Sequence, residues 1–148
     1  MHLQRWGSSG AVKNHMYEYR VSEIGKIVDG DTVDCVLDLG FGMFCKQRIR
    51  LHGIDAPEIH SKDQREKRLA DESLGFVTRW ISENSKNLIV ETFKDDKYGR
   101  LLGRFRTQDG RCINDEMVKI GYAWAYDGGT KHKDLDALEA IRKQARSI

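Results

Sequence analysis

Residues 17–54 contain three strand patterns joined by two glycine-containing turns, and this run constrains the fold more than any other feature of the sequence. The first pattern covers residues 17–28, and a VDGDT turn follows it. In the second, TVDCVLDL, apolar and polar side chains alternate, which is typical of a strand with one buried face. The third, MFCKQRIRLHGI at residues 43–54, alternates in the same way, and we expect Asp55 to end it.

The rest of the chain adds helices and further strands. Residues 59–68 are charged and are predicted to form a loop, after which apolar residues recur at helical spacing from Ala70 to Ile81. Further strands are predicted at residues 88–93 and 99–107, and further helices at residues 113–120 and 135–141. This order of elements predicts an α+β, mainly β fold: a five-stranded Greek-key barrel of the oligonucleotide-binding (OB) type with three helices.

The length and charge of the chain limit the possibilities further. The 148 residues fit a single core. A net charge of +2 supplies no broad basic field, so a nucleic-acid site must come from local clusters of Lys and Arg. Residues 1–15 include a Ser-Ser-Gly stretch, and we predict a leader or disordered arm there, followed by one domain at residues 16–148.

The N-terminal segment and the cysteines bear on the cellular compartment. Residues 1–15 contain no apolar run that could serve as a signal-peptide core or a membrane anchor. The three cysteines, Cys35, Cys45 and Cys112, form no CxxC motif, so a zinc ribbon is not indicated. We expect a cytoplasmic protein in a reducing compartment, with release or secretion left open if the native N-terminus is missing.

Acidic residues near predicted strand ends are candidates for a cation site. Asp31 follows the Asp-Gly turn, Asp55 ends the third strand, and Glu58 lies shortly after it. If the second and third strands pair, Asp31 and Asp55 converge at one rim of the barrel, where two carboxylates, a backbone carbonyl and water would suit Ca²⁺. Glu58 would then lie close enough to hold an attacking water. Taken singly, each acid could instead be a turn or capping residue.

Arg50 and Arg100 are placed to complete such a site. Arg50 lies on the third strand, on the face opposite Ile49 and Leu51, and Arg100 lies at the start of the fifth strand. A guanidinium group is permanently charged and binds phosphate oxygens in pairs. Two arginines and a divalent ion would stabilise the charge that develops on a phosphodiester attacked by water. The alternative for either arginine is a surface ion pair.

Three motifs resemble those of one known family. VDGDT at residues 28–32, RLHGIDAPE at 50–58 and DKYGR at 96–100 resemble the staphylococcal nuclease (thermonuclease) family. GYAWAY at 121–126 is similar to a further segment of that family, so the resemblance covers nearly all of the globular part. It implies an OB-fold, Ca²⁺-dependent enzyme that hydrolyses DNA and RNA and leaves 3′-phosphate and 5′-hydroxyl ends.

The resemblance also implies which residues hold the metal ion. Asp31 and Asp55 would be its carboxylate ligands, and the Ala56 carbonyl would be a further one. Ala56 stands where the staphylococcal protein has threonine, which matters little if only the carbonyl binds. Glu58 would be the general base or the group that orients the attacking water.

The remaining implied roles concern the substrate. Arg50 and Arg100 would bind the scissile phosphate, and Arg100 would also favour departure of the 5′ oxygen. Lys97, Tyr98 and Tyr126 would contact the terminal phosphate, or the sugar and base, of the bound nucleotide. The expected partners are DNA and RNA, with single-stranded or frayed substrate preferred. We expect no membrane association, no obligate protein partner and a monomer.

Several alternatives stay open. OB-folds also bind nucleic acid without cutting it, so a non-catalytic binding module is the main alternative, although such a module has no need of this set of acids and arginines. Residues 59–68 and 127–133 differ from the staphylococcal pattern, which leaves substrate preference open. No His-x-His or His-Asn-His spacing supports a histidine-based nuclease, and His52 is predicted to be an exposed strand residue.

Overall fold

The computed structural model of the protein describes residues 17–93 and 98–147. The predicted arm at residues 1–15 therefore lies outside the described residues. Along the chain, the elements are β1 Tyr17–Asp29, β2 Thr32–Gly40, β3 Met43–Leu51, β4 Ile54–Asp55, α1 Gln64–Asn84, the 3₁₀ turn η2 Ser85–Asn87, β5 Ile89–Phe93, β6 Leu101–Arg106, α2 Ile113–Ile120, β7 Trp124–Ala125 and α3 Leu135–Arg146.

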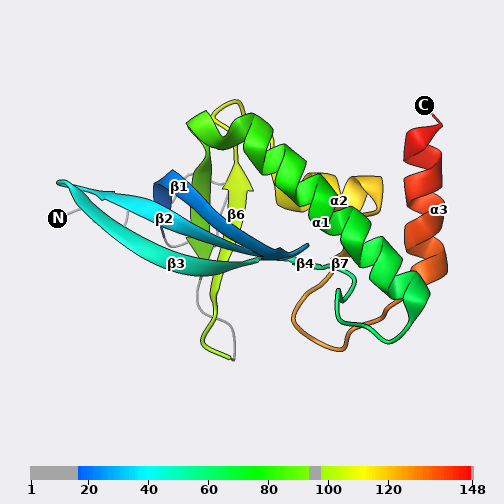
Figure 1. Cartoon of the computed structure of the whole chain (residues 1–148). Helices are drawn as coiled ribbons and strands as arrows, with labels where there is room; N and C mark the ends of the chain where they lie inside the picture. The colour runs from blue at the N-terminus through cyan, green and yellow to red at the C-terminus, as the bar shows by residue number, and fades with distance from the viewer. Residues whose placement is uncertain (1–16, 94–97, 148) are drawn as a thin grey trace, which may run out of the picture.

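Within this described part, five strands close into a barrel in the order β1-β2-β3-β6-β5 (Figure 1). Neighbouring strands pair antiparallel, except β3 and β6, which run parallel. The short strands β4 and β7 pair with each other outside the barrel. The closed barrel and the helices α1, α2 and α3 confirm the predicted OB-type architecture.

The alternating pattern of β2 builds part of the barrel interior. Val33, Cys35 and Leu37 are buried, as the alternation predicts for one face of a strand. The helix α1 contributes Trp80 and Ile81 to the same buried cluster. In Figure 1, α1 (green) begins beside α3 (red) and runs diagonally to the barrel. Burial of apolar side chains from both the sheet and the helix supplies the main driving force for this packing.

The turn between β1 and β2 packs directly against later parts of the chain. A Cβ atom added at Gly30 would lie 2.9 Å from the Cβ of Ala56 and 3.1 Å from the Cβ of Ser73, so only glycine fits without movement. This close approach explains why the turn carries glycine. It also holds the neighbouring Asp31 against the backbone of Ala56.

The third strand is shorter than predicted. β3 ends at Leu51, and Gly53 has a φ of 81°, a backbone conformation that favours glycine and lets the chain turn. The chain then forms β4, in which Asp55 pairs with Trp124 of β7. The prediction that Asp55 ends the third strand is therefore wrong, because a turn separates the two segments.

The helix α1 begins earlier than predicted, so the prediction of a loop across residues 59–68 is wrong in its second half. The side chain of Asp63 accepts hydrogen bonds from the backbone N–H groups of Arg65 and Glu66, at 2.8 and 3.3 Å. Such a cap satisfies donors that the first helical turn leaves without partners. The charged residues that suggest a loop instead form ion pairs across elements, as Arg65 does with Glu139 of α3.

The helix α3 is fixed to the rest of the molecule by a buried arginine. Arg142 donates hydrogen bonds to the Gly121 carbonyl at 2.6 Å, to Ser73 Oγ at 2.8 Å and to Glu72 Oε1 at 2.7 Å. A buried guanidinium is tolerated only when its donors are satisfied in this way. Because β7 and α3 are both anchored, the segment that joins them is held at both ends.

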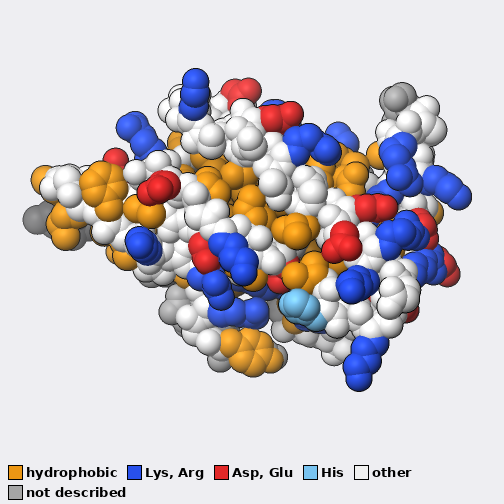
Figure 2. All heavy atoms as spheres, in the orientation of Figure 1, with side chains coloured by type: hydrophobic (Ala, Val, Ile, Leu, Met, Phe, Trp, Pro, Cys, Tyr) orange, Lys and Arg blue, Asp and Glu red, His pale blue; other side chains and the backbone are white. Residues whose placement is uncertain are grey.

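The visible surface carries charges of both signs over the helices, and hydrophobic side chains gather at the tip of the β2–β3 hairpin (Figure 2). The exposed apolar residues of this tip are Leu39, Phe41, Met43 and Phe44. Among the described helices, none is both long enough and apolar enough to cross a lipid bilayer.

Candidate active site

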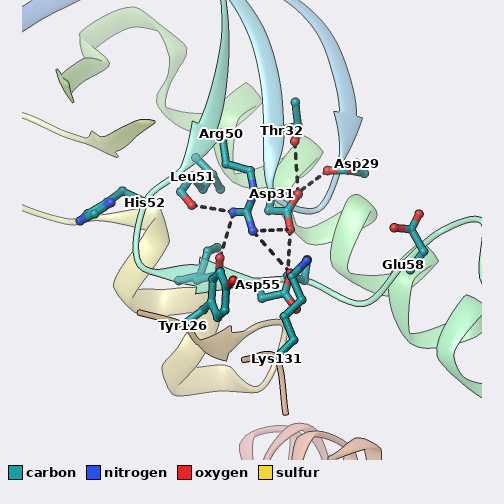
Figure 3. A network of polar contacts seen from close by, with 12 residues as sticks. Asp29, Asp31, Thr32, Arg50, Leu51, His52, Asp55, Glu58, Tyr126 and Lys131 are labelled. Carbon is teal, nitrogen blue, oxygen red and sulfur yellow. Dashed lines mark hydrogen bonds and ion pairs between the residues drawn. The ribbon is translucent and has the colours of Figure 1, made fainter. Parts of the chain in front are cut away.

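Strand pairing brings residues that are far apart in sequence to one rim of the barrel. Because β2 and β3 are antiparallel, the start of β2, directly after Asp31, lies beside Arg50 near the end of β3. Because β6 runs parallel to β3, the start of β6, directly after Arg100, lies beside the same part of β3. β4 carries Asp55 to this rim, and Figure 3 shows Asp31, Arg50 and Asp55 converging. The structure thus brings these predicted site residues together.

The Arg50 guanidinium lies at the centre of the site. Its Nη1 donates hydrogen bonds to the carbonyl oxygens of Leu51 and Ile54, each at 2.9 Å. Its Nη2 lies 3.4 Å from Oδ1 of Asp55 and 3.6 Å from Oδ2 of Asp31. The Arg50 side chain is only 7% exposed, so protein oxygens fix the orientation of the guanidinium.

Asp31 and Asp55 are both buried carboxylates. Asp31 accepts hydrogen bonds from the backbone N–H of Ala56 at 3.0 Å and from the hydroxyl of Thr32 at 3.2 Å. Asp55 Oδ1 lies 3.1 Å from Nζ of Lys131, which comes from the segment between β7 and α3. Two carboxylates from different segments therefore face the same guanidinium nitrogen of Arg50.

A third carboxyl group, that of Asp29, lies beside Asp31 and accepts a hydrogen bond from its backbone N–H at 3.0 Å. Burial, and then the neighbouring Asp31 carboxyl group, raises the pKa of Asp29 to about 7. Burial acts on Asp31 in the same direction, but hydrogen bonds from Asp29 and Ala56 and the charge of Arg50 outweigh it and hold the pKa of Asp31 below its ordinary value. Near neutral pH, Asp31 is therefore ionised, whereas Asp29 retains its proton in a fraction of the molecules.

Arg100 and Arg50 line one pocket of about 410 Å³, together with Tyr98 and Tyr126. The guanidinium carbon of Arg100 lies 5.2 Å from the centroid of the Tyr98 ring. Arg100 is exposed, whereas Arg50 is buried. A pocket that combines two guanidinium groups with aromatic rings suits a phosphate attached to a sugar and a base. The predicted contact from Lys97 lies outside the described residues.

Glu58 is a predicted site residue that the structure does not bring into the cluster. It is exposed, its Oε1 accepts a hydrogen bond from the backbone N–H of His60 at 3.2 Å, and Figure 3 shows it apart from Arg50 and Asp55. The backbone N–H of Glu58 donates to Oε2 of Glu66 at 3.0 Å, which ties the residue to the first turn of α1. The backbone is thus fixed while the exposed side chain can change rotamer without disturbing the core.

The donor atoms at the rim fit a hard cation. Among residues 17–93 and 98–147, no three His, Cys, Asp or Glu side chains form a group that could hold a metal ion. The carboxylates of Asp31 and Asp55 would therefore need a backbone carbonyl, such as that of Ala56, together with water or substrate to complete a coordination shell. Such an all-oxygen set suits Ca²⁺ or Mg²⁺ rather than zinc.

Sequence patterns do not single out two charged residues of the site, Asp29 and Lys131. Asp29 is part of the VDGDT turn, and only its spacing of two residues from Asp31 indicates that the two carboxyl groups share an environment. Lys131 lies in a segment without helical or strand periodicity, so nothing in the sequence places it on Asp55.

The prediction that His52 is an exposed strand residue is wrong. It lies in the turn after β3 and is half-buried, and its ring stacks on that of Phe93 with centroids 4.1 Å apart. Burial, and then the charges of Arg104 and Arg50, lowers the pKa of the His52 imidazole. His52 also lines the pocket of the two arginines, to which it contributes a flat ring.

An OB barrel with carboxylates and arginines at one rim defines a domain suited to binding phosphate, and comparison with known proteins identifies the family. The sequence model of the staphylococcal nuclease homologue family matches residues 48–148. The matched range includes Arg50, Asp55, Glu58 and Arg100, while Asp31 reaches the site from the preceding strands. The chain belongs to the staphylococcal nuclease homologue family.

Individual relatives agree with this assignment. A protein of Escherichia coli O157:H7 named as an uncharacterized endonuclease is 33% identical over 130 residues, which cover 83% of this chain and 72% of that protein. The staphylococcal-like nuclease CAN1 of Arabidopsis thaliana is 37% identical over 68% of this chain and 28% of its own length. The endonuclease YhcR of Bacillus subtilis is 29% identical over 82% of this chain, which corresponds to 10% of that much longer protein.

Proposed function

We propose that the protein is a Ca²⁺-dependent nuclease that hydrolyses phosphodiester bonds in DNA and RNA and prefers single-stranded or frayed substrate. The products would carry 3′-phosphate and 5′-hydroxyl ends. The observation that supports this most strongly is the single cluster of Asp31, Arg50 and Asp55, with Arg100 on the same pocket. A purely structural interaction domain would leave buried carboxylates and a buried arginine at one rim without a purpose.

The two arginines would bind the scissile phosphate. Arg50 is held by carbonyl oxygens, so its guanidinium is already oriented before substrate arrives. Such preorganised charge stabilises a transition state without a reorganisation cost at the moment of reaction. Arg100 is exposed on the same pocket, and its charge would stabilise the 5′ oxygen as the phosphorus–oxygen bond breaks.

Asp31, Asp55 and the Ala56 carbonyl would hold the cation, which when bound supplies positive charge to the phosphate oxygens and acidifies bound water. Glu58 would accept a proton from the attacking water as the water oxygen forms a bond to phosphorus. The departing 5′ oxygen would take a proton from water and Glu58 would return its proton to water, so that one water is consumed for each bond broken. Catalytic hydrogen bonds are often long in ligand-free proteins, and a change of rotamer at Glu58 would bring its carboxylate toward the site.

The aromatic residues of the pocket would contact the nucleotide beyond the phosphate. Tyr98 is 71% exposed and adjoins Arg100, while Tyr126 is held by a hydrogen bond from its hydroxyl to the Gly129 carbonyl at 2.8 Å. An exposed ring can stack on a base only if that base is unpaired, which is the physical reason for the expected preference for single strands.

Cleavage of end-labelled nucleic acid tests this proposal. Single-stranded DNA, duplex DNA and RNA would each be incubated with Ca²⁺, with Mg²⁺ or with a chelator, and the ends of the products would be identified. We expect cleavage with Ca²⁺, fastest on single strands, products with 3′-phosphates, and no cleavage with the chelator.

The same assay distinguishes the alternatives. Tight binding without cleavage under every condition would indicate a non-catalytic OB-fold binding module. Products with 5′-phosphates would contradict the proposed direction of attack. Asp55→Asn serves as the matched variant, since it keeps the size of the side chain and should abolish Ca²⁺-dependent cleavage while the fold remains.

We also propose a cellular compartment and an oligomeric state for this activity. Cys35, Cys45 and Cys112 are free thiols, and the first and last are buried. Free thiols of this kind fit a reducing compartment such as the cytoplasm. We expect the protein to act as a monomer on nucleic acid without an obligate partner, which size-exclusion chromatography with light scattering would check.

A further inference from the structure

Lys131 places a positive charge on one of the two carboxylates proposed to hold the cation. Its Nζ lies 3.1 Å from Oδ1 of Asp55 and 5.7 Å from the centroid of the Tyr126 ring. Figure 3 shows Arg50 and Lys131 reaching Asp55 from different segments of the chain. The Asp55 side chain is 6% exposed, so this ammonium group faces a carboxylate that water hardly reaches.

Arg50 and Lys131 differ in how firmly they are held. Arg50 is 7% exposed and donates hydrogen bonds to two backbone carbonyls, so its position does not depend on Asp55. Its distance to Asp55 Oδ1, 3.4 Å, is long for a charge-assisted hydrogen bond. Lys131 is 48% exposed and lies closer to the same oxygen. Arg50 is therefore the permanent cation of the site, and Lys131 is the one that can leave.

The backbone beneath Lys131 is anchored on both sides. Tyr126, before it, donates its backbone N–H to the Gly53 carbonyl at 2.8 Å. Lys133, after it, forms an ion pair with the buried Glu66 at 3.0 Å. The Lys131 side chain can thus swing between Asp55 and solvent while the backbone stays in place. Release of Lys131 requires only new rotamers of a flexible, partly exposed side chain.

We propose that Lys131 is an internal competitor of the divalent cation: its ammonium group neutralises Asp55 in the ion-free protein and must leave before the cation binds. This inference rests on the proposed function, because it takes Asp31 and Asp55 as the cation ligands. Lys131 then determines how tightly the site binds its cation and, in addition to the longer contact from Arg50, compensates the buried charge of Asp55 when no cation is bound.

The size of the effect follows from the charges involved. A cation that enters the site must break the pair between Lys131 and Asp55 and then meets a like charge a few ångströms away. For a partly exposed ammonium group we expect these costs to weaken cation binding about tenfold, which is equivalent to about 1.4 kcal/mol. Removing the Lys131 charge should therefore strengthen cation binding and destabilise the ion-free protein.

Calorimetric titration of Ca²⁺ into the full-length protein tests the inference without reference to catalysis. We expect Lys131→Gln to bind Ca²⁺ about tenfold more tightly than the wild type. We also expect a lower thermal midpoint for Lys131→Gln in the presence of a chelator, because Asp55 loses the nearer of its two cationic partners and keeps only the longer contact from Arg50. Lys131→Arg keeps the charge and should bind Ca²⁺ with nearly the affinity of the wild type.

A matched control separates local competition from net charge. Lys143→Gln removes one exposed positive charge from α3 and should leave the Ca²⁺ affinity unchanged. If Lys131→Gln and the wild type bind Ca²⁺ equally, the inference is overturned while the proposed function stands. If neither protein binds Ca²⁺ and Asp55→Asn changes nothing, the proposed cation site is wrong. That result would contradict both the inference about Lys131 and the proposed function.

Discussion

Arg100→Ala is expected to lower kcat/KM for single-stranded DNA by about a hundredfold to a thousandfold. Arg100 is exposed and lines the same pocket as the buried Arg50, so a phosphate bound in that pocket would lie between the two guanidinium groups. Its loss removes stabilisation that matters most in the transition state. Most of the decrease should therefore appear in kcat, which steady-state kinetics at saturating Ca²⁺ would measure.

The control for this variant is a second exposed arginine, which lies on β3. Arg48 lies two residues before Arg50 and forms an ion pair with Asp34 at 2.7 Å, outside the pocket. Arg48→Ala should retain nearly full activity. If Arg100→Ala were as active as Arg48→Ala, Arg100 would be a surface arginine without a role in the reaction.

Glu58→Gln is expected to lower kcat by about two to four orders of magnitude while KM changes little. A glutamine keeps an oxygen that can accept the hydrogen bond from the His60 backbone, so the loop should stay in place. It cannot take a proton from water, however.

Asp71→Asn is the matched control for Glu58→Gln, since Asp71 is an exposed carboxyl group on α1. It should leave both kcat and KM unchanged. Normal turnover by Glu58→Gln would show that this residue takes no part in catalysis. The structure places Glu58 outside the cluster of Asp31, Arg50 and Asp55, so the proposed role requires its side chain to change rotamer.

Local sequence patterns predict the barrel strands well, because each strand depends on the alternation of apolar and polar side chains. One face of β2 must be apolar to line the interior, and Val33, Cys35 and Leu37 supply that face in a short stretch of sequence. The spacing of apolar residues in α1 is equally local. Short connections account for the pairing of β1 with β2, β2 with β3 and β5 with β6, whereas the pairings that close the barrel, β3 with β6 and β1 with β5, join segments far apart in the chain.

Boundaries are predicted less well because single residues and distant partners decide them. The start of α1 depends on the capping side chain of Asp63, which does not stand out among the neighbouring charged residues. The end of β3 depends on the turn at Gly53 and on pairing of β4 with β7, about seventy residues away in sequence. No local pattern contains that pairing.

Some features of the candidate site can likewise be predicted from the sequence, and others cannot. The convergence of Asp31 and Asp55 is predictable, because the pairing of β2 with β3 brings Asp31 beside Arg50, and Asp55 follows β3 by only a few residues. The ion pair of Lys131 with Asp55 is not, because an irregular segment carries the lysine and only tertiary anchors fix its path. The burial of His52 against Phe93 is likewise a tertiary effect.

A crystal structure with Ca²⁺ and a short single-stranded oligonucleotide that carries a non-hydrolysable linkage would show whether the acids and arginines of this rim hold one cation and one phosphate. We expect one Ca²⁺ between the carboxylates of Asp31 and Asp55. Arg50 and Arg100 should contact the adjoining phosphate, and Lys131 should be turned away from Asp55. A cation bound elsewhere, or a phosphate that contacts neither arginine, would contradict it.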